Sequence, residues 1–426
     1  MTEESKKKKA IEIIRRRENG RMISYLNSCV HCGLCAESCI FYLAGKDPRF
    51  IPARKVDLVA SLYRRYNTLT GRLLPGLTGA RELNDKTIEE MVDILYGSCT
   101  MCGRCTMHCS IGLDISEVVR LGRNMLSAMD LVPATLQSTV KAAIETGNNM
   151  AISKEDLVDT IKWLEEDLQF ELDDQKATIP LDEPGKKIIY TLNPREPKFF
   201  PLSISAMAKI FYMAGESWTL STKMYDVTNY AYFSGNDNEA SEIVNRLADV
   251  TRELGAEKVV LAECGHGSRS FRWEGPNYIG SKYTFEVYTS VELINDYIRS
   301  GRIKPDPSKN TKRVTLHDPC NLVRGGGIMK EQREILERSV SSFTEMNPFG
   351  NDNYCCGGGG GQLSMSEYNE RRMGAGKIKA DQIKATGAEV VVTPCHNCVD
   401  QLIQINQAYK LNVQIKTMAE IVADAL

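Results

Sequence analysis

Apolar residues recur every three to four positions through the first third of the chain, whereas short apolar runs dominate after residue 185. The early spacing predicts helices, and no convincing strand pattern precedes residue 185. The predicted helices are residues 5–26, 52–66, 87–96, 115–129, 134–145 and 154–168. The first domain, residues 1–165, is therefore expected to be all-α.

The later part of the chain alternates short apolar runs with helical stretches. The runs are residues 187–192, 259–262, 314–317 and 390–393, and the helical stretches are residues 240–254, 329–339 and 366–386. This alternation is typical of α/β domains with largely parallel sheets. An acidic, proline-containing stretch, residues 166–184, precedes it and predicts a linker.

Three pairs of segments indicate a degenerate internal repeat. KIIYTLNP (187–194) parallels RVTLHDPC (313–320), YFSG (232–235) parallels YCCG (354–357), and GAEKVVLAECGHG (255–267) parallels GAEVVVTPCHNC (387–398) with one inserted residue. Self-similarity of this kind predicts a duplicated unit. The expected fold class is thus α + α/β, with two pseudo-duplicated α/β lobes at residues 185–310 and 311–426.

The overall charge and the cysteine count reduce the number of possible functions. The 426 residues carry a formal net charge of −2, without the basic excess of a protein that binds nucleic acid. No apolar run is long enough to cross a bilayer, and the basic start has no secretory h-region. We therefore expect a cytoplasmic protein, in which 14 cysteines indicate metal or redox chemistry rather than disulfides.

Eight of the cysteines form two C-x2-C-x2-C-x3-C blocks, a spacing that holds 4Fe–4S cubanes. The blocks are Cys29, Cys32, Cys35 and Cys39, then Cys99, Cys102, Cys105 and Cys109. Three sulfurs of a loop reach one cluster, while the fourth commonly serves the other cluster. Zinc is the alternative, but its two ligand pairs leave the third cysteine without a role. Neighbouring His31 and His108 are expected to be neutral donors that tune the potential, not ligands.

Five further cysteines follow predicted strands or lie in a glycine-rich turn. They are Cys320, Cys355, Cys356, Cys395 and Cys398. Strand ends are where open α/β sheets hold ligands, and five thiolates exceed the need of one zinc ion or one cubane. Phosphate binding by the glycine run 357–361 is a weaker alternative, because the Lys-Ser/Thr of a P-loop is missing. Simple burial does not explain an adjacent cysteine pair in a glycine turn.

The pattern C-x34-C-C-G-x37-C-x2-C resembles the CCG domain of heterodisulfide reductases. The segments CVHCGLCAESC, HDPCNLVRGGG, YCCGGGGG and TPCHNC carry the resemblance, which covers nearly the whole chain. The architecture is similar to the D-type subunit of that enzyme and, more closely, to the DsrK- and TmcB-like proteins. These proteins join an α-helical ferredoxin domain to a CCG domain.

The resemblance implies two cubane clusters and one noncubane 4Fe–4S cluster bound by the five C-terminal cysteines. It also implies disulfide or related sulfur chemistry that proceeds one electron at a time. In the first lobe four of the five equivalent cysteines are absent, at about Pro194, at Phe233 and Ser234, and at Gly267. A single-cluster variant is therefore expected, not a two-cluster disulfide mechanism.

The implied function is that of a heterodisulfide reductase-like oxidoreductase subunit on the inner face of the cytoplasmic membrane. Electrons would pass between a quinone-linked b-type cytochrome subunit and a thiol/disulfide substrate. A multihaem cytochrome, other iron–sulfur subunits and a DsrC-like thiol protein are further candidate partners. Two alternatives stay open: a non-catalytic relay between cytochrome and quinone pools, and the iron–sulfur subunit of a glycolate/lactate oxidase-type flavoenzyme. The basic N-terminal helix is expected to help docking through Lys6, Lys7, Lys8 and Lys9 and through Arg15, Arg16 and Arg17, with a solvated helix end as the alternative.

Cys264 stands outside these groups, and the repeat aligns it with Cys395. Together with Glu263 and His266 it forms a candidate catalytic group in which protonation couples to redox state. We predict that Cys264 faces the noncubane cluster across the cleft between the two lobes. The alternative is a buried leftover of a decayed motif, since free cysteines are commonly buried.

Overall fold

The computed structural model describes residues 2–426 and divides them into two compact units. Unit 1 comprises the residues up to Ser138 with Tyr230–Asp237 and Tyr354–Lys379, and unit 2 comprises Thr139–Asn229, Asn238–Asn353 and Ala380–Leu426. This division differs from the predicted boundary at residue 165, because the first stretch of unit 1 ends at Ser138. Each unit combines separate stretches of the chain, because the two CCG-type loops of the repeat fold with the N-terminal part.

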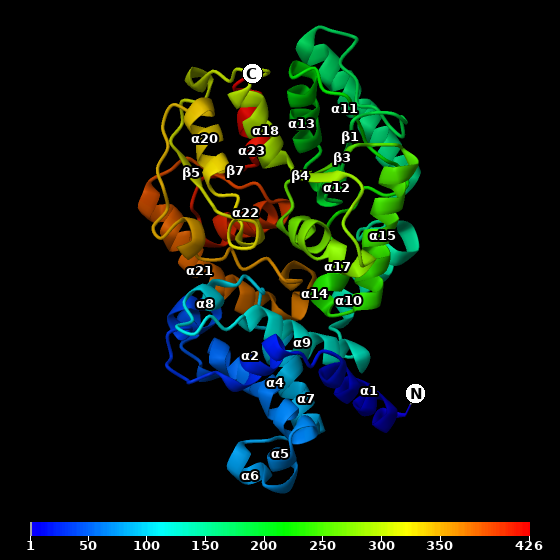
Figure 1. Ribbon diagram of the computed structural model, residues 1–426. Helices are drawn as coiled ribbons and strands as arrows, with labels where there is room; N and C mark the ends of the chain where they lie inside the picture. Colours follow the sequence, from blue (N-terminus) through cyan, green and yellow to red (C-terminus); the bar gives the residue numbers. More distant parts are fainter. Residues whose placement is uncertain (1) are drawn as a thin grey trace. The chain divides into compact units, whose positions relative to one another are not determined.

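Unit 1 is helical, as the early hydrophobic spacing predicts (Figure 1). Its helices are α1 (Glu3–Arg16), α2 (Gly20–Asn27), α3 (Ile40–Gly45), α4 (Pro52–Asn67), α5 (Leu69–Leu73), α6 (Pro75–Thr78), α7 (Asp85–Met91), α8 (Arg104–Met107), α9 (Ile115–Ala128) and α14 (Tyr230–Ser234). α9 packs against α1, α4 and α14. The predicted helix 5–26 is interrupted, because the Asn19 side chain accepts the Met22 amide and starts α2.

Unit 2 contains two parallel sheets, which confirms the predicted α/β pattern. Their strand orders are β2-β1-β3-β4 and β5-β6-β7. The strands are β1 (Ile188–Tyr190), β2 (Trp218–Thr219), β3 (Lys258–Leu261), β4 (Glu286–Thr289), β5 (Val314–Leu316), β6 (Val390–Val392) and β7 (Gln414–Lys416). Ile189 pairs with Val259, and their repeat equivalents Thr315 and Val391 also pair. This matching register supports the proposed duplication.

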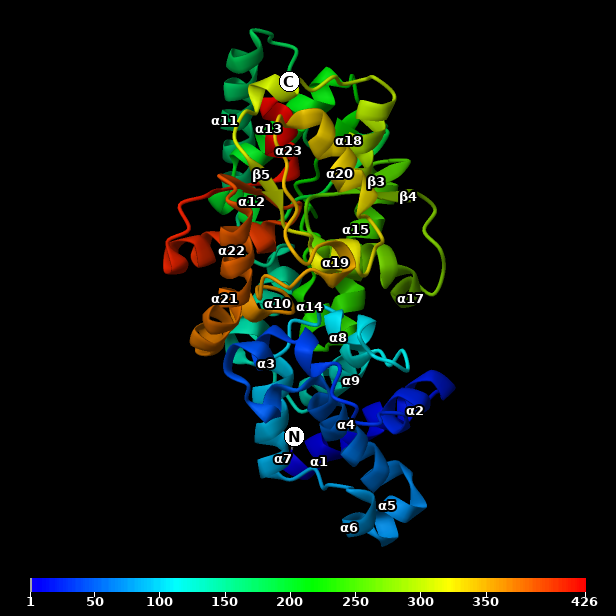
Figure 2. The ribbon, with the colours of Figure 1, turned by 90° about the vertical axis from the view of Figure 1, so that its left-hand side faces the viewer.

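The remaining helices lie wholly or partly in unit 2. They are α10 (Ala134–Thr146), α11 (Lys154–Leu172), α12 (Arg195–Phe199), α13 (Leu202–Met213), α15 (Asp237–Glu253), α16 (Gly265–Gly267), α17 (Gly275–Ile279), α18 (Ser290–Arg299), α19 (Cys320–Val323), α20 (Lys330–Ser339), α21 (Asn369–Thr386), α22 (His396–Tyr409) and α23 (Met418–Asp424). Figures 1 and 2 show α13, α18, α20 and α23 gathered beside the strands. No helix in the described part of the chain has the length and hydrophobicity to span a bilayer.

One apolar core joins both sheets of unit 2 and includes α11. Tyr190 and Val392, from the two sheets, belong to it together with Leu164 and Leu168 of α11. α11 continues to Leu172, into the first part of the predicted linker 166–184, and buries these leucines.

Candidate iron–sulfur sites

The two ferredoxin-type blocks form matching loops in unit 1. One loop connects α2 to α3, and the other precedes α9. Both turn through left-handed residues at the same places: His31 (φ 54°) and Gly33 (84°) in the first loop, and Met101 (54°) and Gly103 (73°) in the second. In the second loop the Met101 amide donates to Cys99 Sγ at 3.4 Å. The repeated sequence thus produces the same sulfur-facing turn twice.

Each loop contributes its fourth cysteine to the cavity of the other loop. The first cavity is lined by Cys29, Cys32, Cys35 and Cys109, and the second cavity by Cys39, Cys99, Cys102 and Cys105. The walls are otherwise mainly apolar, with Val56 and Leu113 in the first cavity and Ile40 and Phe41 in the second. This exchange of the fourth ligand is the arrangement of two-cluster ferredoxins.

The spacing of these sulfurs fits clusters better than single zinc ions. Thiolates on one zinc ion lie about 3.8 Å apart, because each Zn–S bond is about 2.3 Å long. Among the residues that the structure describes, no three of these eight cysteines bring their sulfurs within 4.8 Å of one another. A cubane holds its ligands on separate iron atoms and so keeps them further apart.

Lys55 is a buried cation in the wall of the second cavity. It donates to the Ser98 carbonyl, and its Nζ lies 3.8 Å from Cys39 Sγ. Burial opposes its charge, but the thiolates of Cys39, then Cys99, and the other two cysteines of this cavity hold the pKa of Lys55 above its ordinary value. An anionic group in the second cavity therefore has a positive charge beside it.

The adjacent pair Cys355 and Cys356 lies buried in the glycine turn that folds with unit 1. The amides of Gly357 and Gly358 donate to Cys355 Sγ and Cys356 Sγ at 3.3 and 3.4 Å. Cys355 Sγ also lies 3.4 Å from Thr100 Oγ1 in the second ferredoxin loop. The glycine amides thus face sulfur, which disfavours the phosphate alternative.

Equivalent residues of the repeat have equivalent settings in unit 1. Gly235 and Gly357 have φ values of 90° and 98°. The rings of Tyr232 and Tyr354 each lie under an arginine guanidinium, at 4.2 and 4.0 Å. The YFSG and YCCG segments thus share a left-handed glycine and a tyrosine under an arginine, although Tyr232, Phe233 and Ser234 belong to helix α14 and Phe233 and Ser234 stand in place of the cysteines.

The other three C-terminal cysteines follow strands of unit 2. Cys320 begins α19 after β5, Cys395 precedes α22 after β6, and Cys398 lies in the first turn of α22. The turn before Cys320 is fixed by Asp318, which accepts two hydrogen bonds from Arg333, at 2.6 and 2.9 Å. These cysteines thus occupy the carboxyl ends of parallel strands, where such sheets place ligand sites.

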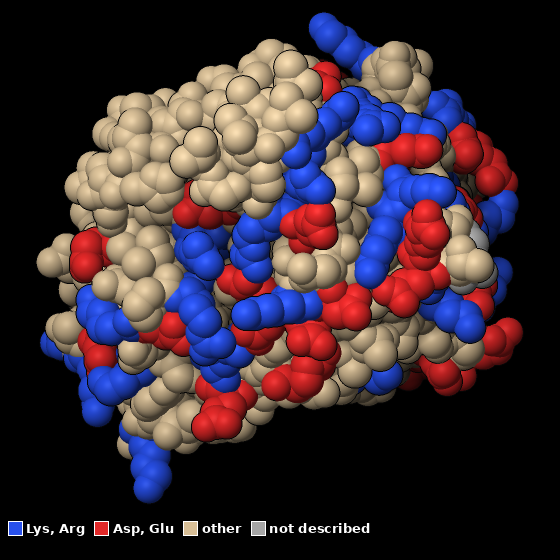
Figure 3. Space-filling model, turned by 90° about the horizontal axis from the view of Figure 1, so that it is seen from below, with Lys and Arg blue, Asp and Glu red and all other residues tan. Residues whose placement is uncertain are grey.

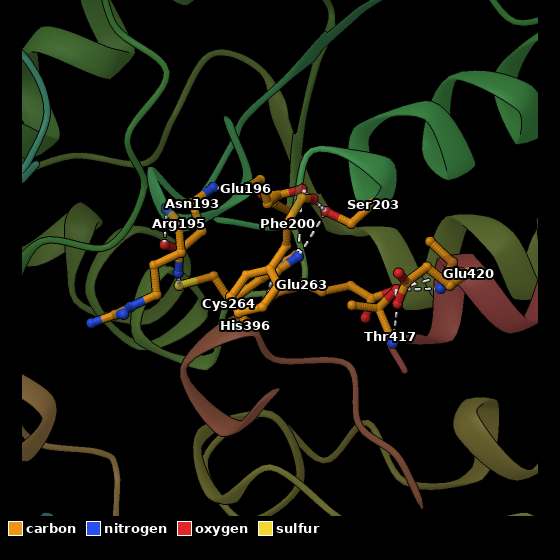
Figure 4. Close-up of polar contacts among 12 residues, drawn as sticks. Asn193, Arg195, Glu196, Phe200, Ser203, Glu263, Cys264, His396, Thr417 and Glu420 are labelled. Carbon is orange, nitrogen blue, oxygen red and sulfur yellow. Dashed lines mark hydrogen bonds and ion pairs between the residues drawn. The ribbon is translucent and has the colours of Figure 1, made fainter. Parts of the chain in front are cut away.

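Cys264 is buried in unit 2, with 1% of its surface exposed. Its Sγ accepts from Asn193 Nδ2 at 3.6 Å and from the Gly267 amide at 3.4 Å (Figure 4). Burial, and then the Cys395 thiolate, raise the pKa of Cys264 above its ordinary value. A β-carbon built on neighbouring Gly265 would lie 3.7 Å from Cys395 Sγ. The structure therefore brings Cys264 into the neighbourhood of Cys395.

Two asparagines that the sequence did not single out connect this group. Asn193 Nδ2 donates to Asn397 Oδ1 at 3.0 Å, and Asn397 Nδ2 lies 2.7 Å from His266 Nδ1. Asn397 stands between the last two cysteines, and Asn193 precedes the position that the repeat aligns with Cys320. The cysteine motif and the repeat mark these two positions in the sequence, but asparagine is not a usual cluster ligand.

Glu263 has a different role from its neighbour Cys264. Its carboxylate accepts the amides of Met418 and Ala419, at 2.9 and 2.6 Å, at the start of α23. Figure 4 shows its side chain extending towards Thr417, whereas Cys264 points towards Asn193. These contacts give the Glu263 carboxylate a structural function as a helix cap.

Comparisons with known proteins agree with the cysteine pattern. Residues 25–113 match the 4Fe–4S dicluster domain, and residues 314–403 match the cysteine-rich CCG domain. The chain is 27% identical to the Hdr-like menaquinol oxidoreductase iron–sulfur subunit 2 of Archaeoglobus fulgidus, over 94% of this chain and 80% of that protein. It is also 27% identical to the D-type subunit of the dihydromethanophenazine:CoB–CoM heterodisulfide reductase of Methanosarcina barkeri, over 94% of both chains.

A more distant relative is the EtfAB:quinone oxidoreductase of Syntrophomonas wolfei, which is 24% identical over 88% of this chain and 54% of that protein. The two matched domains contain all eight loop cysteines and all five C-terminal cysteines. The expected resemblance is thereby confirmed: the chain is an iron–sulfur protein of the oxidoreductase type, homologous over 94% of its length to the D-type subunits of heterodisulfide reductases and to the Hdr-like menaquinol oxidoreductase iron–sulfur subunits.

Proposed function

We propose that this chain passes electrons between a quinol-linked b-type cytochrome in the membrane and a thiol/disulfide reaction at its C-terminal cysteines. The observation that carries the proposal is the pair of four-cysteine cavities, of which the second lies beside Cys355 through Thr100. Relatives named as menaquinol oxidoreductase and heterodisulfide reductase subunits support the two ends of this path.

The proposed cofactors are two cubane 4Fe–4S clusters and one noncubane 4Fe–4S cluster, which together supply one-electron transfer. The two cavities of unit 1 would hold the cubanes. Cys320, Cys355, Cys356, Cys395 and Cys398 would hold the third cluster, which the match to the CCG domain supports because it contains all five. Backbone amides that donate to sulfur, as at Cys355, lower the negative charge on the ligands and so help to set the potential.

Anaerobic reduction of the assembled membrane complex with a menaquinol analogue, followed by EPR of the clusters, tests this function. We expect the clusters to be reduced in the complex but not in the isolated chain, and to be reoxidised by a disulfide substrate. Reduction that requires a flavoprotein and a 2-hydroxy acid would instead establish the glycolate/lactate oxidase-type alternative. Reoxidation by quinone alone would establish the relay alternative.

We further propose that the Cys264 thiol takes part in the sulfur chemistry, with His266 held beside it through Asn397. Replacing Cys264 with alanine or serine is expected to abolish turnover with the thiol partner while iron content stays complete. The serine variant retains a hydrogen-bonding atom for Asn193 and Gly267 but has no sulfur, so it separates chemistry from packing. Normal turnover in both variants would identify Cys264 as a buried leftover of the decayed motif.

We propose that the chain docks on its membrane-embedded partner through α5 and α6, which contact an apolar face of that partner. Leu69, Leu73, Leu74 and Leu77 on these helices are between 53% and 84% exposed. Residues 69–80 contain one cation, Arg72, and no acidic residue. Figures 1 and 2 show α5 and α6 at the tip of unit 1, and Figure 3, which views the molecule from below, shows both charged side chains and a broad area without them. Such an exposed apolar patch marks an interaction site.

The basic start of α1 offers less free charge than the sequence suggests. Lys6 pairs with Asp130 at 3.0 Å, Lys7 with Glu3 at 2.7 Å, and Lys8 with Glu4. Pairing within the chain reduces the charge available to a membrane surface, so α5 and α6 are the stronger docking candidate.

Changing Leu69, Leu73 and Leu77 to glutamine is expected to abolish co-purification with the membrane subunit in detergent. The matched control changes Phe170, Leu202 and Met213, which are also exposed, and should leave co-purification intact. A second comparison measures the binding of the chain and of the leucine variant to lipid vesicles that lack the partner. Binding to vesicles that is lost in the leucine variant would show that lipid, not the partner, is the occupant.

A further inference from the structure

The two cavities of unit 1 have opposite charges in their surroundings, although their loops match. Beside the first cavity the Asp57 carboxylate lies 2.9 Å from His31 Nε2. Lys55 lines the second cavity. Both charged residues belong to α4, and because they are two positions apart they face different directions.

Arg123 adds a second buried cation next to the second ferredoxin loop. It is fully buried in α9, and its guanidinium donates to the Cys99 carbonyl at 2.7 Å. It also donates to the carbonyls of Phe233 and Gly360, at 2.6 and 2.8 Å, in the two CCG-type loops. All its described hydrogen bonds end on backbone carbonyl oxygens, so none of them places a carboxylate against its charge.

These charges change how easily a cluster beside them is reduced. A cluster held by four thiolates is anionic, and each added electron makes it more so. A buried positive charge within a few ångströms stabilises the reduced form, because little water screens it. A nearby carboxylate disfavours the reduced form for the same reason.

We propose that Lys55 and Arg123 make the cluster of the second cavity the higher-potential of the two cubanes. Electrons that enter at the first cavity then collect in the second, whose loop contacts Cys355 through Thr100. This inference rests on the proposed function, since it presupposes both cubanes. Lys55 and Arg123 are positioning residues that bind no iron themselves.

A redox titration of the whole chain, followed by EPR, tests this order of potentials. Lys55→Met removes the charge at similar volume, and Lys55→Gln also keeps a donor for the Ser98 carbonyl. In both variants the higher-potential cubane signal is expected to shift to lower potential, while the lower-potential signal stays in place. Lys86→Met, an exposed change in the same unit, should move neither signal.

A Cys32→Ser background, which disables the first cavity, assigns the signals. The cubane signal that survives there should be the higher one and should still respond to Lys55→Met. Unchanged potentials in variants with complete iron, or a shift of the lower signal alone, would overturn the inference. Absence of cubane iron in the unaltered chain would instead refute the proposed function, so the two failures are distinguishable.

Discussion

Replacing Cys39 and Cys102 together is expected to remove no more iron than replacing either residue alone, about four atoms per chain. The reason is that Cys39, although it belongs to the first block, lines the second cavity with Cys102. Replacing Cys39 and Cys32 together should instead remove about eight atoms, because these two residues of one block serve different cavities. Iron and labile sulfide per chain, measured on serine variants purified without oxygen, give the comparison.

The single variants Cys32→Ser and Cys102→Ser are the controls for this non-additivity, since each disables one cavity. If the Cys39/Cys102 pair lost eight irons and the Cys39/Cys32 pair lost four, each block would hold its own cluster. The exchange of the fourth ligand between the loops would then be wrong.

Replacing Gly360 with alanine is expected to eliminate the noncubane cluster and leave both cubanes, so that about eight of about twelve irons remain. Gly360 has a φ of 63°, and its β-carbon would lie 2.6 Å from the Thr100 carbonyl oxygen. An L-residue is disfavoured in this conformation, and the three atoms that the β-carbon would meet all belong to the Thr100 backbone, which cannot move aside as a flexible side chain can. The loop with Cys355 and Cys356 then cannot pack closely against the second ferredoxin loop.

Gly374→Ala is the matched control for this change. Gly374 lies within α21, and an added β-carbon there meets nothing within 4 Å. The iron content of the Gly374→Ala variant should equal that of the unaltered chain. Complete iron in Gly360→Ala, with an unchanged third EPR signal, would show that this close approach does not matter for the C-terminal site.

The hydrophobic pattern predicted the strands with buried apolar runs and missed the strands that are partly polar or very short. β1, β3, β5 and β6 were predicted because their residues are almost wholly apolar and buried. β4 and β7 begin at exposed polar residues, Glu286 and Gln414, and so lack an apolar run. β2 has only two residues. β2, β4 and β7 lie at sheet edges, but the edge position alone does not decide, since β5 is also an edge strand and its residues are buried.

The cysteine spacing predicted the loops because ligands of one loop are close in sequence. It did not predict the buried cations, since Lys55 and Arg123 lie outside the cysteine blocks, 43 and 24 residues from the Ser98 and Cys99 carbonyls to which they donate. The composition of the two units was not predicted from the sequence for a similar reason. The YFSG and YCCG loops fold with the N-terminal unit through such contacts as Arg123 with Phe233, and no local pattern marks a partner so far away.

The content of iron, labile sulfide and zinc in the anaerobically purified chain tests most directly whether the cysteines bind clusters. Two cubanes and one noncubane 4Fe–4S cluster predict about twelve irons and twelve sulfides per chain, without stoichiometric zinc. About eight irons with one zinc would make the C-terminal cysteines a zinc site and would contradict the proposed sulfur chemistry there. Two or more zinc ions without iron would contradict the iron–sulfur function altogether.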